Sequence, residues 1–161
     1  MQLIKDQQII DNEWQHADEI GELPSGKITV PVSRWQAERE ALIARDDIGL
    51  RLTAIDTLDT IKDDLQHFEI IAIEFEKFND GRGFSLARLL RERYGYQGEI
   101  RAMGTLLRDQ LYYLQRSGFN AFELSEGQNL QDALKAFEAF TVTAQPDVLH
   151  TKETVQAGPW R

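Results

Sequence analysis

Residues 69–103 read EIIAIEFEKFNDGRGFSLARLLRERYGYQGEIRAM, and this stretch decides the fold class. Residues 70–73 are apolar at consecutive positions, which is typical of a strand with both faces covered. A helix predicted from about Phe84 to Tyr94 places its apolar residues on one side: Leu86, Leu89, Leu90 and Tyr94. Residues 99–103 predict the next strand. This strand–helix–strand order favours a parallel pair joined by a right-handed crossover.

The same alternation extends outward in both directions. Further strands are predicted at 27–32, 49–54 and 121–124. The predicted helices start at Ser33 with capping-box spacing, at a cap on Asp56 or Thr57, at about Thr105, and at Asn129 as N-cap. We therefore expect an α/β fold, with an open, mostly parallel sheet of about five βα units and helices on both faces. A half-barrel-like arrangement is the alternative.

The N-terminus differs from this pattern. Residues 2–14 predict a small β-hairpin, because Leu3-Ile4 and Ile9-Ile10 flank a polar turn. We expect one domain over 1–143 that includes this hairpin, followed by a polar, mobile tail over 144–161.

Composition narrows the function classes. The 161 residues include no cysteine, which excludes disulfides, thiol catalysis and thiolate-bound metal clusters in this chain. No apolar run is long enough to span a bilayer, so a cytoplasmic protein is expected. The net charge of −9 argues against nucleic-acid and anionic-membrane binding. Residues 82–116 nevertheless hold seven arginines and no lysine, which favours bidentate recognition of oxyanions or carboxylates, or else a solvated helix face.

The loop after the central strand is the first candidate site. Asp80, Gly81, Arg82 and Gly83 stand immediately before a helix, with Ser85 in its first turn. Glycines let backbone approach a ligand, and free N–H groups at a helix start attract anions. Arg82 would clamp an anion or an acidic partner group. In the alternative interpretation Asp80 accepts local backbone N–H bonds and pairs with Arg82.

A second candidate group surrounds the next strand. Arg101 lies in a strand suited to burial, so it needs a partner or the open end of the sheet. Arg108, Asp109 and Gln110 follow at the start of a helix, and a pair between Arg101 or Arg82 and Asp109 is expected. The histidines at 16, 67 and 150 have no metal-ligating or catalytic-triad residues near them in the sequence, and we predict that they are surface residues. No metal or cofactor is predicted.

Two groups of motifs resemble the bacterial DUF934 family. The first runs Phe75-x-x-Phe78-x-Asp80-Gly81-Arg82-Gly83-Phe84-Ser85-x-Ala87-x-x-Leu90-Arg91. The second comprises Gly95-Tyr96-x-Gly98-Glu99-x-Arg101-Ala102-x-Gly104, Asp109-Gln110 and Gly118-Phe119-x-Ala121-Phe122. The resemblance, which covers residues 1–145, implies an oxidoreductase of sulfite reduction associated with the sulfite reductase haemoprotein and adenylylsulfate reductase. Glu76 and Ser117 stand where the family often has proline and cysteine.

These observations together predict an accessory or electron-delivery protein of assimilatory sulfite or sulfate reduction. Its arginine-based site would lie at the carboxyl edge of the sheet and bind an anion or a partner. The alternative is a small-molecule binding domain for a sulfur oxyanion or an adenylylated sulfur compound. An acid–base enzyme that uses Glu74 or Asp109 is a third interpretation. The N-terminal hairpin or an edge strand offers a homodimer contact.

Overall fold

The computed structural model describes residues 1–138, and its centre is one eight-stranded sheet in the order β2-β1-β8-β7-β6-β5-β4-β3. Six neighbouring strands run parallel: β3 (Gln15–His16), β4 (Ile28–Pro31), β5 (Ile48–Thr53), β6 (Ile70–Phe75), β7 (Glu99–Gly104) and β8 (Ala121–Glu123). The antiparallel hairpin of β1 (Gln2–Lys5) and β2 (Gln8–Asp11) is added beside β8. The strands predicted from apolar runs are all present, as is the hairpin.

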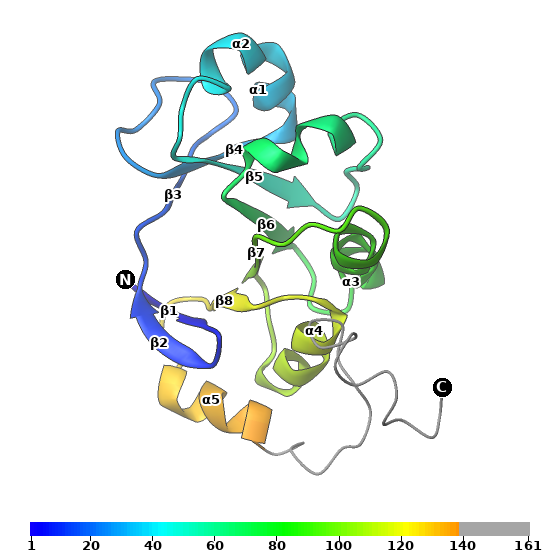
Figure 1. Cartoon of the computed structure of the whole chain (residues 1–161). Helices are drawn as coiled ribbons and strands as arrows, with labels where there is room; N and C mark the ends of the chain where they lie inside the picture. Colours follow the sequence, from blue (N-terminus) through cyan, green and yellow to red (C-terminus); the bar gives the residue numbers. More distant parts are fainter. Residues whose placement is uncertain (139–161) are drawn as a thin grey trace.

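Chain connectivity forces this sheet to curl. Strands β2 and β3 form its two edges, yet only residues 12–14 join them. A flat sheet of eight strands would separate its edges by about 34 Å, at about 4.8 Å per strand. Three linking residues span at most about 14 Å. The sheet is therefore a half-barrel, and Figure 1 shows the chain passing directly from β2 to β3 along one side of the molecule.

Helices follow the parallel strands. They are α1 (Val32–Ala37), α2 (Arg39–Leu42), the 3-10 helix η1 (Lys62–His67), α3 (Gly81–Arg88) with the π-helical turn η2 (Leu89–Arg93), the 3-10 turn η3 (Arg108–Gln110), α4 (Leu111–Ser117) and α5 (Leu130–Glu138). Asn129 caps α5 as predicted, because its Oδ1 accepts a hydrogen bond from the Asp132 N–H at 3.0 Å. The domain boundary expected at 143 and the tail expected over 144–161 lie outside the described residues.

Two predicted helix starts are wrong. Helix α1 begins at Val32 after Pro31 and has no side-chain cap, so the spacing from Ser33 is not a capping box. Asp56 caps no helix, because its carboxylate accepts hydrogen bonds from the backbone and hydroxyl of Thr53 and closes the turn after β5.

The two faces of the half-barrel differ in chemistry. Side chains on the outer face are apolar and pack with the helices in one core; they include Val30, Leu50, Ile73, Ala102 and Phe122 from the strands and Trp35, Leu65, Leu90, Leu114 and Phe137 from the helices. The opposite positions of the same strands carry Thr29, Arg51, Glu74, Glu99, Arg101 and Glu123. Figure 1 shows no helix against this inner face in the described part of the chain.

The expectation of helices on both faces is therefore wrong, and the half-barrel alternative fits. Ile70 and Ala72, which suggested two covered faces, point to the inner side and are buried there. The curl of the sheet, rather than a second helix layer, removes them from water. Beside them, the inner face carries polar side chains that bond one another.

Candidate functional site

At the start of α3, the side chains of Asp80 and Arg82 bond each other and the helix backbone. Asp80 is the N-cap and accepts a hydrogen bond from the Arg82 N–H at 3.1 Å. Its carboxylate also receives the Arg82 guanidinium through Nε at 3.0 Å and Nη2 at 2.9 Å. These bonds, foremost the one from the Arg82 side chain, lower the pKa of Asp80. The donors that an anion would need at this helix start are thus bonded to Asp80, as in the alternative interpretation of the sequence.

The other residues of this loop have structural contacts. Ser85 Oγ donates to the Gly81 carbonyl at 3.3 Å, and therefore bonds its own helix. Gly83 is buried against β6, where an added Cβ would lie 2.4 Å from the Phe75 ring. Its lack of a side chain serves the packing of α3 on the sheet, whereas the sequence suggested an approach to a ligand. Gly81 has open space around it.

We expect Arg82→Lys to leave the midpoint of thermal unfolding unchanged. The Arg82 side chain is 64% exposed, and its bonds to Asp80 are made at the surface, where water replaces them at little cost. A melting curve of the variant beside the wild type measures this. A clear fall in the midpoint would show that the Asp80–Arg82 pair holds the loop in place.

The loop after β7 lies beside the same end of the sheet. Arg108 Nε contacts the Asp132 carboxylate at 3.0 Å, and its Nη1 lies 3.6 Å from Asp109. Gln110 Nε2 donates to the Phe78 carbonyl at 2.6 Å, which ties this loop to the one before α3. Asp109 is 92% exposed. The predicted pairing of Asp109 with Arg101 or Arg82 is wrong, because Arg82 bonds Asp80 and Arg101 lies inside the half-barrel.

Arg101 is the most buried charged residue of the described chain, with 2% of its surface exposed. Its Nε donates to Glu99 at 2.7 Å, while its Nη1 donates to Glu123 at 3.2 Å and to Asn12 Oδ1 at 3.0 Å. Lys5 Nζ lies 3.2 Å from the other Glu99 oxygen. The need of Arg101 for partners was predicted from its strand, but Glu99, Glu123 and Asn12 were not identified.

His16 completes this interior cluster from the opposite edge of the sheet. Its Nε2 lies 2.8 Å from Glu123 Oε2, and its Nδ1 lies 2.7 Å from Thr29 Oγ1. Asn12 Nδ2 donates to the remaining oxygen of Glu123. His16 is therefore partly buried and bonded on both ring nitrogens, so its prediction as a surface residue is wrong. These bonds hold β3 to β8 across the half-barrel and close it.

A sequence signal for this cluster exists. Glu99 and Arg101 alternate with apolar residues along β7, and Thr29 and Glu123 do so in β4 and β8. Period-two alternation indicates that one face of each strand is polar. What the sequence does not show is that these faces turn toward one another, because that follows from the curl.

The carboxylate of Glu123 is held in its charged form. Burial opposes ionisation, but hydrogen bonds from His16 and Asn12 and the positive charges of His16 and Arg101 outweigh it and lower the pKa of Glu123. A buried carboxylate that accepts this many hydrogen bonds has a structural role, because it holds the surrounding side chains in place. No histidine or acidic cluster able to hold a metal ion occurs among the residues that the structure describes.

The lowered pKa of Glu123 predicts an acid-sensitive fold. The ionised group contributes stability that is complete above its unfolded pKa, near 4.5, and is lost as pH falls through the lower folded pKa. We expect the gap in unfolding free energy between wild type and Glu123→Gln to narrow from about pH 6 to about pH 3. Urea unfolding at each pH measures this gap, and a gap that stays constant would contradict the assignment.

Large apolar side chains are exposed at the carboxyl ends of β5, β6 and β7. Ile55, Phe78 and Leu107 follow these neighbouring parallel strands and are 74%, 42% and 43% exposed. Arg82 and Arg108 lie on the same loops. We call Ile55, Phe78, Arg82, Leu107 and Arg108 the carboxyl-edge surface. It contains two of the predicted site residues, Arg82 and Arg108, while Arg101 lies in the interior.

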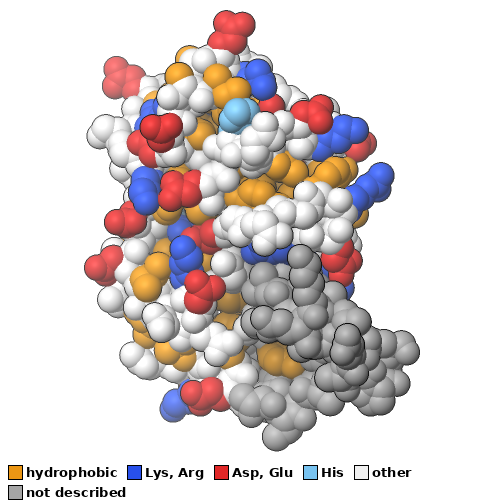
Figure 2. Space-filling view, in the orientation of Figure 1, with side chains coloured by type: hydrophobic (Ala, Val, Ile, Leu, Met, Phe, Trp, Pro, Cys, Tyr) orange, Lys and Arg blue, Asp and Glu red, His pale blue; other side chains and the backbone are white. Residues whose placement is uncertain are grey.

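A groove of about 310 Å³ adjoins this surface between residues 54–59 and α3. Leu58, Leu86, Leu89 and Tyr94 form its apolar walls, and Arg82 and Arg93 supply positive charge. Asp56 and Asp59 line it as well. Figure 2 shows hydrophobic side chains at the surface between η1 and α3. Arg82 and Ser85, both predicted site residues, are thus brought together at one groove.

Comparisons with known proteins identify the family. The model described as "Bacterial protein of unknown function (DUF934)" matches residues 49–155, from β5 onward. No curated protein and no solved structure shows a significant match. In the described part of the chain, no helix has the length and apolar character needed to cross a membrane. Because the family model covers about two thirds of the sequence and includes the α3 loop and Arg101, the chain belongs to the DUF934 family.

Proposed function

We propose that this protein is an accessory protein of assimilatory sulfite reduction that docks the sulfite reductase haemoprotein in the cytoplasm. The carboxyl-edge surface is the observation that carries this proposal. Three large apolar side chains exposed beside two arginines are typical of a docking patch, where apolar contacts supply affinity and arginines supply orientation. The choice of the haemoprotein as partner rests on what the resemblance to the family implies.

Charge supports docking over an independent redox role. Arg82 and Arg108 are 64% and 41% exposed at the carboxyl edge, where acidic groups of a partner can replace their contacts to Asp80 and Asp132. The chain has no cysteine, and electron transfer through its own dithiol or thiolate-bound cluster is therefore ruled out. Docking to the haemoprotein requires neither a dithiol nor a metal cluster in this chain.

The groove beside α3 favours a second candidate, the binding of an adenylylated sulfur compound. Such a ligand combines a flat ring with anionic groups, and the groove combines Tyr94 and leucine walls with Arg82 and Arg93. Calorimetry with adenylylsulfate, sulfate and sulfite tests this candidate. Heat released with adenylylsulfate alone would favour this candidate. The absence of heat with all three compounds at about 1 mM would contradict it, since a Kd of about 1 mM corresponds to a binding free energy of about 4 kcal/mol.

Growth of a deletion strain tests the proposed pathway. We expect loss of growth on sulfate and normal growth on sulfide or cysteine, because only the first requires sulfite reduction. The gene in trans should restore growth on sulfate. Normal growth of the deletion strain on sulfate would contradict the proposed role in sulfite reduction.

Docking itself is tested by co-purification from cells grown on sulfate. We expect the haemoprotein to accompany the wild-type protein and to be lost with Phe78→Asp plus Leu107→Asp, since buried unpaired charges disrupt an apolar interface. Gln97→Asp is the control, because Gln97 is exposed in the loop before β7, at the amino ends of the parallel strands. Equal recovery with all three proteins would exclude this surface as the docking site.

A further inference from the structure

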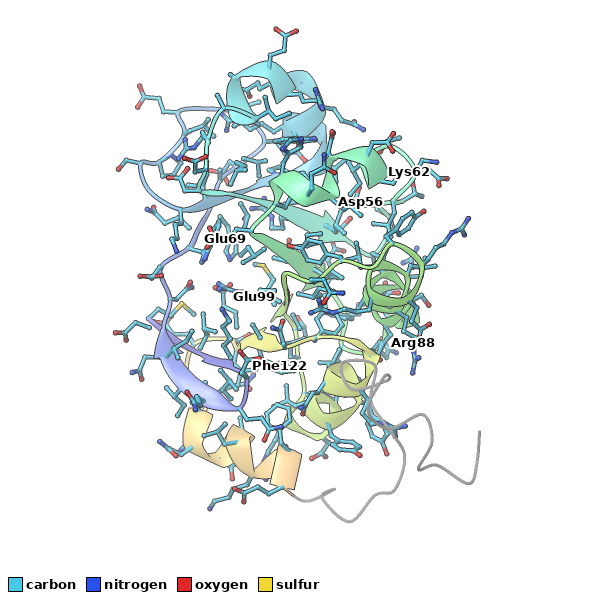
Figure 3. All side chains as sticks on the ribbon, viewed as in Figure 1. Asp56, Lys62, Glu69, Arg88, Glu99 and Phe122 are labelled. Atoms are coloured by element: carbon cyan, nitrogen blue, oxygen red, sulfur yellow. The ribbon has the colours of Figure 1, made fainter. Side chains whose placement is uncertain are left out.

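A second opening lies at the amino ends of the parallel strands, opposite the carboxyl-edge surface. It is a recess of about 140 Å³ that leads into the half-barrel. Arg101 and Glu99 form its floor, and Lys5, Glu13, Lys27 and Glu69 lie around its mouth. Figure 3 shows Glu69 and Glu99 on the side of the sheet away from Arg88 of α3. We call this feature the amino-end recess.

The floor of the amino-end recess has an unused donor. The Nε and Nη1 atoms of Arg101 bond Glu99, Glu123 and Asn12, whereas its Nη2 has no hydrogen-bond partner among the described residues. Arg101 is 2% exposed and lines the recess. This nitrogen is not sealed from solvent, and at the floor of the recess it is available to donate a charge-assisted hydrogen bond to an oxygen ligand.

The mouth of the recess carries acceptors that are only loosely engaged. Lys27 Nζ lies 3.4 Å from Glu13 and 3.6 Å from Glu69, both longer than an ordinary charged hydrogen bond. The hydrogen bond that Lys27 donates to Glu13 and the negative charge of Glu69 raise the pKa of Lys27. Glu13 and Glu69 side chains are 71% and 49% exposed. Beside its contact with Lys27, each carboxylate can therefore accept a further bond from an ammonium group.

Mixed charge decides the class of ligand. A lone anion that reaches Arg101 must pass Glu13 and Glu69, and a lone cation at those carboxylates would face Lys5, Lys27 and Arg101. Figure 2 shows acidic and basic side chains intermixed along the side of the molecule where Figure 1 draws β1 and β3. A ligand that bears both charges a few ångströms apart meets neither repulsion.

We propose that the amino-end recess binds a small zwitterion of the α-amino acid class, with its carboxylate on Arg101 and Lys5 and its ammonium on Glu69 and Glu13. The volume equals that of about five water molecules, which fits glycine, alanine or serine and rejects long side chains. Trp14, Ile10 and Ile70 form the apolar walls, and they face the short side chain. This site is separate from the carboxyl-edge surface and does not depend on the docking proposal.

Titration of the full chain followed by nuclear magnetic resonance tests the site through the indole N–H signal of Trp14, which lines it. The probes are glycine, L-alanine and L-serine, with acetate, methylammonium and sulfite as singly functional comparisons. We expect at least one amino acid to give a saturating shift with a Kd of about 1 mM or lower, and at least about tenfold weaker binding of every comparison ion. No saturating shift from any amino acid would overturn the proposal. Acetate or sulfite binding as tightly as the amino acids would also overturn it, since that result indicates a simple anion site.

Variants of the carboxylates at the mouth of the amino-end recess test the ammonium-binding role separately from the buried cluster around Arg101. Glu69→Gln combined with Glu13→Gln should weaken amino-acid binding by about tenfold or more, because the ammonium loses its charged acceptors. Glu126→Gln is the matched control: this exposed carboxylate follows β8 at the other end of the sheet and should leave the Kd unchanged. Unchanged binding in the double variant, or equal weakening in the control, would contradict the assignment.

Discussion

Arg101→Met is expected to destabilise the protein by about 3–5 kcal/mol, because it leaves Glu99 and Glu123 as buried charges without their main partner. Both carboxylates lie under 10% exposed on the inner face of the half-barrel. Methionine replaces the volume of the arginine stem but donates no hydrogen bond. The shift in urea midpoint, multiplied by the slope of the transition, measures the loss.

Arg88→Met supplies the comparison for this variant. Arg88 lies on α3, half-exposed, with Glu92 at 3.5 Å one turn away, so its loss should cost less than about 1 kcal/mol. Adding Glu123→Gln to Arg101→Met should recover part of the loss, since it removes one unpaired charge. Equal effects of Arg101→Met and Arg88→Met would show that the interior cluster contributes nothing beyond an ordinary surface pair.

The sequence predicts the strands of this fold better than their three-dimensional arrangement. Apolar runs identified β4 to β8 because each buries one face against helices, and that burial is local information. The strand β3 has only two residues and no apolar pattern, yet it forms an edge of the sheet. The half-barrel follows from the short link over 12–14, whose effect is visible only when both edges are known.

The candidate site was predictable to a similar degree. The loops with Asp80, Arg82 and Gln110 were located at the carboxyl ends of parallel strands, since that position follows from βα order. The partners of Arg101 come from residues such as Asn12 and Glu123, which are 111 positions apart and bonded to each other. The closure of the sheet brings such distant residues together. The spacing of residues within one segment therefore does not predict these pairs.

Motif residues of the family serve mainly as scaffold in this structure. Arg91 Nη1 donates to the carbonyls of Tyr96 and Gly98 at 2.8 and 2.7 Å, and its Nε donates to the Gly118 carbonyl at 3.0 Å. One half-buried arginine thus ties η2 to the turns before β7 and β8. Arginine without lysine in this segment, interpreted above as oxyanion recognition, is explained at this position by capping of backbone carbonyls.

Gly83→Ala is expected to destabilise the protein by about 1–3 kcal/mol through overpacking. The added Cβ would lie 2.4 and 2.5 Å from two atoms of the Phe75 ring, closer than carbon atoms approach without displacement. Phe75 is 1% exposed and is held between the rings of Phe84 and Phe119, at centroid distances of 5.7 and 5.9 Å. Because the ring has nowhere to move, α3 must shift from β6. Urea unfolding measures the cost.

Gly81→Ala is the matched test, two positions earlier in the first turn of α3. No atom lies within 4 Å of a Cβ built there, and the backbone is not in the left-handed region, so alanine should raise stability by up to about 1 kcal/mol through the unfolded state. Opposite signs for the two variants identify Gly83 as a packing residue and Gly81 as a free position. If Gly81→Ala retains stability but abolishes co-purification of the haemoprotein, the loop backbone contacts the partner directly. Equal tolerance of alanine at both positions would contradict the close packing of α3 on Phe75.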